Sequence, residues 1–421
     1  MKSLFTTAAA VALLAAAPAL AVTKTEVLEN YANIAQANYG DALALAQVLD
    51  STVQAFVANP SAENLQAAKA AWLAARVPYQ QTEVFRFGNA IVDDWEGLVN
   101  AWPLDEGLID YVDTASYGGP TDENELAALN VIANPSFTVG GQSVDATVIN
   151  AALIGETLFE ADEIESNVSR GYHAIEFLLW GQDLNGTDAG AGNRPWTDYA
   201  AGADCTNGNC DRRGDYLVAA TALLVSDLEW MAGQWGEAGE ARNTLMQDET
   251  AGISAILTGM GSLSYGEVAG ERMRLGLMLN DPEEEHDCFS DNTHNSHYYD
   301  GLGVQNIYLG SYTGVDGAVV SGASVSDLIA EADADAAEAL RADIAATMAA
   351  LTKLKVAAEA GMAYDQMLAV GNEGGNALIM GGVNGFVQQA KSTERAVNAL
   401  ALSAIEFEGS DSLDNPSAVF E

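Results

Sequence analysis

The chain has 421 residues, of which 60 are Asp or Glu and only 17 are Lys or Arg, so its formal net charge is −43. This charge repels nucleic acids and anionic lipid surfaces, which excludes both as expected partners. It also discourages self-association at low salt, so we expect a monomer whose partners are cations or surfaces that carry them.

The first 21 residues have the pattern of a secretory signal peptide. Lys2 precedes an apolar run that is too short to cross a bilayer, and the run closes on Ala19-Leu20-Ala21. Cleavage is expected after Ala21. No later window holds the roughly 18 consecutive apolar residues that a membrane span requires. We therefore expect an exported protein without a membrane span, in the periplasm or at the cell surface.

The first block of helices is predicted within residues 22–210. Apolar residues recur every three or four positions over residues 25–87, with a break at Asn59-Pro60-Ser61. Residues 89–150 are less regular and predict loop with one short helix, and the strand-like piece 136–141 allows a hairpin. A helix is expected again over residues 148–180.

The second block is predicted within residues 211–421. Helical patterns cover residues 212–279 and 325–407, separated by a polar stretch at 280–303 that predicts a loop. A glycine-rich run at 371–385 is expected to interrupt the last helix. The order of helices, polar insertion and helices thus occurs twice. It predicts an all-α fold of two similar helical bundles related by an ancient duplication, although the amino-acid sequence contains no strict repeat.

Cys205 and Cys210 lie on either side of a Thr-Asn-Gly-Asn turn. In an oxidising compartment this short separation favours a disulfide. The spacing fits no common zinc template, and Cys288 is left as an unpaired thiol.

His173 and Glu176 form the sharpest candidate site. Three residues apart on a helix, they project from the same face. Bulky residues surround positions 171–180 on nearly all sides, so the helix should be buried and the carboxylate must find a cation or a donor. An imidazole with a carboxylate suits iron, zinc or manganese. The alternative is that His173 and Glu176 only form a hydrogen bond with each other in the core.

A second cluster follows at residues 75–89. On one continuous helix, Arg76, Tyr79, Glu83 and Arg86 would share a side, although Pro78 should kink or restart that helix. Glu83 is either a buried ion-pair partner of the arginines or a carboxylate ligand that they and Tyr79 support.

Two further groups of acidic residues are candidate metal ligands. Asp105 follows Trp102-Pro103-Leu104, where an acid can cap a helix. Farther along, Glu285 and His286 belong to an acidic run that holds three of the four histidines. Such a run usually forms a charged surface loop, but its histidines also allow contact with a metal.

Four segments together resemble the imelysin-like proteins, and within them the branch of iron-regulated protein A. Gly171-x-His173-x-x-Glu176 matches the GxHxxE signature of that family. The segments at 75–88, 102–106 and 285–293 resemble parts of the same branch, in the same order. The resemblance implies two similar helical bundles, an envelope location, and a site with His173 and Glu176 near the junction of the halves.

The resemblance also implies iron, because the chain is more distantly similar to a periplasmic iron-uptake component with a GxHxxE domain. The expected function is therefore iron binding for acquisition or homeostasis, alongside envelope iron-uptake components. The alternative is an imelysin-type metallopeptidase. No HExxH motif is present, and the residues alone assign neither a three-ligand zinc set nor a general base.

We predict the metal ligands to be His173 and Glu176, with Glu83 and Asp105 brought in by the fold. An oxygen-rich set with one imidazole favours iron, with zinc or another divalent cation as the alternative. Because imidazole must be neutral to bind, affinity should fall as the pH drops through the titration range of the histidine.

Overall fold

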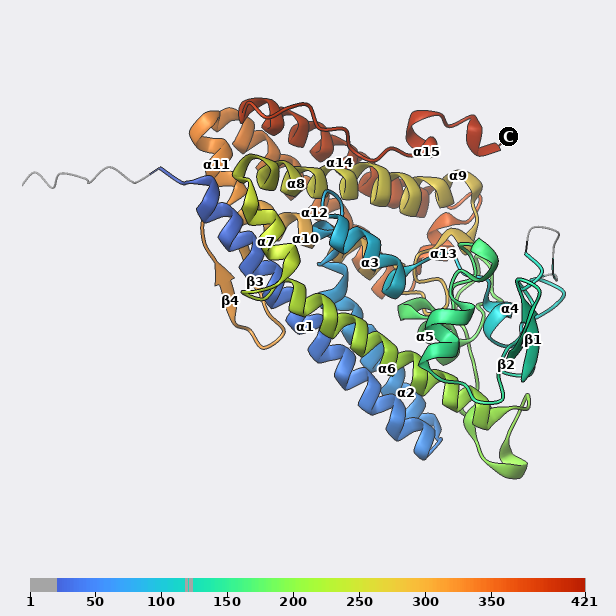
Figure 1. The fold of residues 1–421 in the computed structure, drawn as a ribbon. Coiled ribbons are helices and arrows are strands. Elements are labelled where there is room, and N and C mark those ends of the chain that lie inside the picture. The colour runs from blue at the N-terminus through green and yellow to red at the C-terminus, as the bar shows by residue number, and fades with distance from the viewer. Residues whose placement is uncertain (1–20, 118–119, 121–123, 421) are drawn as a thin grey trace, which may run out of the picture.

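The computed structural model describes residues 21–117, 120 and 124–420, and helices make up most of it (Figure 1). The predicted all-α class is confirmed. Strands are confined to two short antiparallel hairpins, β1 (Ser136–Val139) with β2 (Gln142–Asp145) and β3 (Ser311–Thr313) with β4 (Val319–Ser321). Residues 1–20 of the predicted signal peptide lie outside the described residues.

A first bundle forms around three long helices, α1 (Lys24–Ala58), α2 (Ala62–Gln80) and α6 (Cys210–Gln234), with α1 packed against both others (Figure 1). Thr23 caps α1 and Ser61 caps α2, each through its side-chain oxygen. The shorter helices beside them are α3 (Ala90–Asn100), α4 (Glu106–Ile109), α5 (Gly171–Trp180) and α7 (Glu240–Gln247).

A second bundle forms around α12 (Ala334–Glu359) and α14 (Glu373–Ala399), which pack against each other. The predicted interruption at 371–385 is confined to its start: residues 371 and 372 precede α14, and the helix then continues through the remaining glycines. A Cβ on Gly385 would lie 3.0 Å from the backbone of Thr347, so this glycine lets the two helices approach closely. The remaining helices are α8 (Glu249–Ser262), the π-helical η6 (Leu263–Leu275), α9 (Gly276–Leu279), α10 (Thr293–Leu309), α11 (Val325–Ala332), α13 (Tyr364–Leu368) and α15 (Asp411–Asp414).

Helix α10 joins the bundles, since it packs against α12 on one side and α2 on the other. One continuous apolar core runs through both bundles. The predicted domain boundary after residue 210 stays a prediction, and α6, which begins there, packs against α1.

The prediction of one continuous helix over residues 148–180 is wrong for its middle part. Residues 151–158 are helical, but the chain is then irregular up to α5, and Glu160, Asp162 and Glu163 have positive φ values. The side chains of Asn167 and Ser169 donate to the carbonyl oxygens of Ala161 and Ile154. Such side-chain bonds offer the backbone an alternative to a helix. The other short helical segments of the described residues are the π-helical η2 (Leu153–Leu158) and the 3₁₀ segments η1 (Glu83–Phe85), η3 (Ala161–Glu163), η4 (Trp196–Tyr199), η5 (Gly202–Asp204), η7 (Pro282–Glu284) and η8 (Ala418–Phe420).

By length and hydropathy, α6 is the one helix in the described part of the chain that could cross a membrane. It packs in the first bundle, where Arg213 binds both carboxylate oxygens of Asp110.

Candidate functional site

Helix α5 carries His173 and Glu176 into the interior. It begins at Gly171, whose φ is +84°, and a Cβ there would lie 2.6 Å from the carbonyl oxygen of Val99. Glycine alone combines this left-handed backbone with so close an approach. All ten residues of α5 are buried, so water does not satisfy the polar atoms of His173 and Glu176.

Hydrogen bonds around Asn100 fix the tautomer of His173. Asn100 Nδ2 donates to Glu96 Oε1 at 2.9 Å, and Asn100 Oδ1 accepts from Arg76 Nη1 at 2.7 Å. Because arginine can only donate, this orientation of the amide is settled. The same Oδ1 lies 3.1 Å from His173 Nε2. Nε2 must therefore carry the proton, which leaves the imidazole lone pair on Nδ1.

That lone pair faces two carboxylates. His173 Nδ1 lies 3.2 Å from Glu176 Oε2 and 3.9 Å from Asp287 Oδ1. Three electron-rich atoms that converge in this way require either a proton on a carboxylate or a cation between them. Burial and the proximity of Asp287 raise the pKa of Glu176 well above its usual value, which is the response expected in the absence of a cation.

A second imidazole reaches the same point from the loop before α10. The ring centroids of His286 and His173 are 4.7 Å apart, in edge-to-face contact. His286 is 2% exposed, and neither of its nitrogens has a hydrogen-bond partner among the described residues. One ligand atom each from His173, His286 and Asp287 lie within 4.8 Å of one another. Two imidazoles and a carboxylate are a donor set that suits iron or zinc.

Asp287 is held from both bundles. Its Oδ1 accepts from Arg76 Nη2 of α2 at 2.7 Å, and its Oδ2 accepts from Asn292 and from Ser296 of α10. Burial opposes ionisation, but Arg76 and these donors bring the pKa of Asp287 below its usual value. The carboxylate is therefore ionised, as a metal ligand must be.

Both imidazoles are neutral over the physiological range. Burial, reinforced by the positive charge of Arg76, lowers the pKa of His173 to about 3. Burial and the positive charge of Arg272 lower the pKa of His286 well below its usual value. The predicted loss of metal at low pH stays a prediction, and these lowered pKa values place it below the ordinary titration range of histidine.

Glu83 is engaged elsewhere. Helix α2 ends at Gln80, so the helical phase that would align Glu83 with Arg76 is lost at η1. Glu83 Oε2 accepts from Arg272 at 2.8 Å, and no group of metal-ligating atoms in the described residues contains it. The same arginine contacts Glu267 and Asp300, and Arg86 pairs with Asp93, Glu96 and Glu267.

The other predicted site residues lie as follows. Asp105 accepts hydrogen bonds from Tyr117, Asn124 and Ser166, so neighbouring donors satisfy its carboxylate. The Tyr79 ring lies under the guanidinium of Arg76, at 5.6 Å. The structure thus brings Arg76 to His173 and Glu176, and it places Asp105 in a separate hydrogen-bond network. Cys205 and Cys210 are joined by a disulfide.

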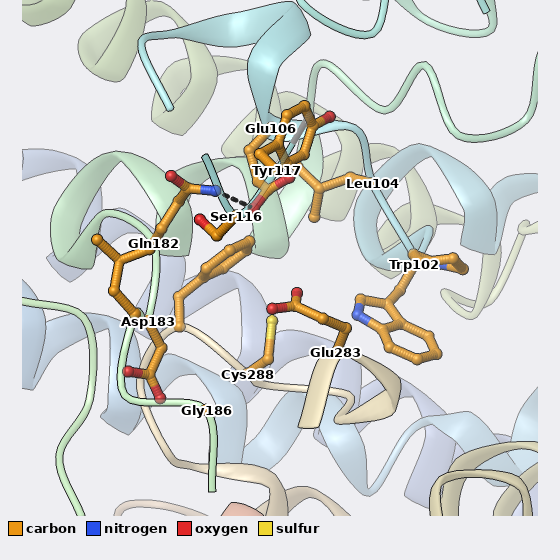
Figure 2. Close-up of a pocket in the computed structure, with 13 residues that line it drawn as sticks. Trp102, Leu104, Glu106, Ser116, Tyr117, Gln182, Asp183, Gly186, Glu283 and Cys288 are labelled. Atoms are coloured by element: carbon orange, nitrogen blue, oxygen red, sulfur yellow. Dashed lines mark hydrogen bonds between the residues drawn. The ribbon is translucent and has the colours of Figure 1, made fainter. Parts of the chain in front are cut away.

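Two cavities adjoin the site. One of about 460 Å³ is lined by Asn100, Trp102 and His286, and by the charged side chains around Arg272. The other, of about 380 Å³, also contacts Trp102, and Figure 2 shows Gln182 donating to Glu106 on one wall and Cys288 on another. The first cavity is thus lined by His286, a candidate ligand.

Asn100 and Asp287 are the site residues that sequence reasoning missed. Asp287 lies next to His286 in the acidic run, which the sequence predicts as a surface loop. A usable signal was the pair Cys288-Phe289, because apolar residues beside these acids indicate that the segment turns inward. Helix α10 begins at Thr293, so the predicted loop at 280–303 is wrong in its second half.

Comparison with known proteins agrees with this fold. The sequence profile of the imelysin family matches residues 35–393. Iron-regulated protein A of Synechococcus elongatus is 39% identical over 72 residues, which are 17% of this chain and 20% of that relative. The matched segment thus spans about a fifth of the relative.

Two solved structures share the architecture. A putative iron-regulated protein A precursor from Parabacteroides distasonis has a TM-score of 0.63 and 17% identity, and the match covers 91% of this chain and 97% of that one. An imelysin-like protein from Psychrobacter arcticum has a TM-score of 0.55 and 14% identity, covering 92% and 98% of the two chains. At these identities the likeness concerns the fold. Because the family profile spans most of the chain, the protein belongs to the imelysin family.

Proposed function

We propose that this protein binds iron in the cell envelope, through His173, His286 and Asp287, with Glu176 as a fourth ligand. The observation that carries the proposal is the convergence of unprotonated His173 Nδ1 on two carboxylates, beside an imidazole without a hydrogen-bond partner in the described residues. This set replaces Glu83 and Asp105, whose carboxylates are bound elsewhere.

The donor chemistry supports iron over calcium or magnesium. Two neutral imidazoles with one or two carboxylates suit a borderline divalent ion, whereas calcium and magnesium prefer oxygen alone. The relative in Synechococcus elongatus is named for its regulation by iron. Iron acquisition or homeostasis is the role that joins these two observations.

Export is part of the proposal. The disulfide between Cys205 and Cys210 fits an oxidising compartment, as does the leader pattern of the first 21 residues. In the envelope, the partners of an iron-binding protein would be iron-uptake components.

Metal analysis of the purified protein tests the site. After anaerobic loading with Fe(II) and desalting, the wild type should retain one iron per chain. His173→Ala and His286→Ala should lose it, with helical dichroism unchanged. The matched control is His294→Ala, because His294 lies in α10 outside the ligand group. Full iron retention by His173→Ala would refute the proposal.

A metallopeptidase is the second candidate, and one observation favours it. Two histidines, one carboxylate and a nearby Glu176 resemble a catalytic zinc site with a general base. Against it, His173, His286 and Asp287 are at most 2% exposed, and a peptide must reach the metal to be cleaved. Cleavage of unfolded protein substrates that requires zinc and is lost in His173→Ala would favour the peptidase.

A further inference from the structure

Three aspartates from distant segments meet beside the loop that carries His286. Asp183 follows α5, Asp291 precedes α10, and Asp365 lies in α13. One carboxylate oxygen from each lies within 4.8 Å of the other two. Like charges at such separations repel one another strongly unless a cation or a proton offsets them.

The most buried of the three is also unsatisfied. Asp365 is 1% exposed, and neither of its carboxylate oxygens has a hydrogen-bond partner of normal geometry among the described residues. The nearby backbone N–H groups of Gln366 and Asp365 only partly oppose the rise in its pKa that burial causes. Asp291 Oδ1 is likewise buried without a partner there. A buried carboxylate in this condition is unfavourable, so its position indicates a missing positive charge.

No side chain in the described part of the chain supplies that charge. The ion pairs of the described residues include none of the three aspartates, nor the neighbouring Glu285, which is 1% exposed. Burial raises the pKa of Glu285 well above its usual value, and the charges of Asp365, Asp291 and Asp183 raise it further, so Glu285 lies in the same negative field.

We propose that Asp183, Asp291 and Asp365 bind a calcium ion, with Glu285 adding negative charge beside them. Carboxylate oxygens are the ligands that hard divalent cations prefer, and the set contains no imidazole or thiolate. Two oxygens that share one calcium at about 2.4 Å can be up to about 4.8 Å apart. Magnesium fits less well, because it requires shorter bonds and a near-ideal octahedron.

The loop of Asp183 is arranged to present one oxygen. Asp183 Oδ1 accepts from the backbone and side-chain nitrogens of Asn185, which leaves Oδ2 free for the ion. Figure 2 shows the Asp183 carboxylate directed away from Glu106 and Gln182. The ion would thus tie α13 and the loop after α5 to the segment that carries His286 and Asp287. The calcium site itself does not depend on the proposed iron site.

Calorimetric titration of the purified protein with CaCl₂, at physiological ionic strength, tests the proposal. The wild type should show one saturable site with a Kd of about 1 mM or lower. Asp365→Asn should weaken binding at least about tenfold, as should Asp291→Asn. Asp94→Asn on α3 makes the same charge change at an exposed position and should bind as the wild type does. His173→Ala should also keep calcium binding, which separates this site from the iron site.

Three results would overturn the proposal. One is the absence of saturable heat up to about 10 mM calcium, well above the range of weak extracellular sites. Another is equal affinity in Asp365→Asn and the wild type, which would assign the heat to the general negative charge. The third is magnesium binding as tight as calcium binding, which would contradict the choice of ion.

Discussion

Arg76 donates from Nη1 to Asn100 and from Nη2 to Asp287, so one guanidinium orients both the residue that fixes the His173 tautomer and the carboxylate that faces it. The guanidinium carbon of Arg76, Cζ, also lies 5.0 Å from the centre of the Tyr172 ring. The planar guanidinium group is needed here, because a lysine ammonium cannot donate two divergent hydrogen bonds in fixed directions.

Replacing Arg76 by Met should therefore destabilise the protein by about 3–5 kcal/mol, since Asp287 would stay buried without its cation. Urea unfolding at neutral pH measures this change. Arg395→Met removes an exposed arginine of α14 and should leave stability nearly unchanged. Equal stabilities of Arg76→Met and Arg395→Met would show that the buried pair contributes nothing.

Glu106 gives a pH-dependent prediction. Burial raises its pKa to about 7 from an ordinary value of 4.5, so the folded state favours the protonated form. The associated stability is present below pH 4.5 and is lost as the pH rises through about 7.

Glu106→Gln should accordingly be more stable than the wild type at pH 8, by about 1–3 kcal/mol, and similar to it near pH 4.5. Urea midpoints at the two pH values provide the comparison. Glu29→Gln, on an exposed position of α1, should show no such difference between them. A larger gain in stability for Glu106→Gln at pH 4.5 than at pH 8 would contradict the raised pKa of Glu106.

At the scale of elements, the start of α5 depends on one glycine. Gly171→Ala forces a Cβ against the Val99 carbonyl in a left-handed conformation. We expect a loss of about 3 kcal/mol or more, together with loss of bound iron, because α5 must shift. Gly233→Ala in α6, where a Cβ meets nothing within 4 Å, is the matched control and should be neutral or stabilising. Thermal melts and metal analysis of both variants test this.

Periodicity predicted the long helices well, because α1, α2, α6, α12 and α14 each keep an apolar stripe over several turns. It failed where side chains bind the backbone, as at Asn167 and Ser169, since such bonds leave no periodic trace. Periodicity also overestimated the helix-breaking effect of the glycines in α14, whose role is close packing.

The candidate site shows the same division. Spacing along one helix was enough to pair His173 with Glu176, because both lie in α5. It misplaced Glu83, because α2 ends at Gln80 and helical phase does not continue past that point. Asp287 comes from a segment 111 residues after Glu176, and no local pattern encodes a contact over that separation.

At the scale of the whole molecule, the net charge of −43 works against the compact state. Salt shortens the range of this repulsion, to about 10 Å at 0.1 M. The melting temperature should therefore rise by a few degrees as NaCl increases from low to physiological concentration. A matched series with uncharged sucrose, at the same osmolality, separates screening from solvent exclusion. A melting temperature that falls with NaCl would contradict the prediction.

The ligands of the proposed iron site lie on both sides of the contact between α5 and the segment before α10, which we call the seam. His173 and Glu176 belong to α5 of the first bundle, while His286 and Asp287 precede α10, the helix that joins the two bundles. An ion bound by all four would make opening of the seam and release of the ion the same event. Metal loading should then slow amide hydrogen exchange along α5 and α10 together, and the two bundles should unfold as a single cooperative unit.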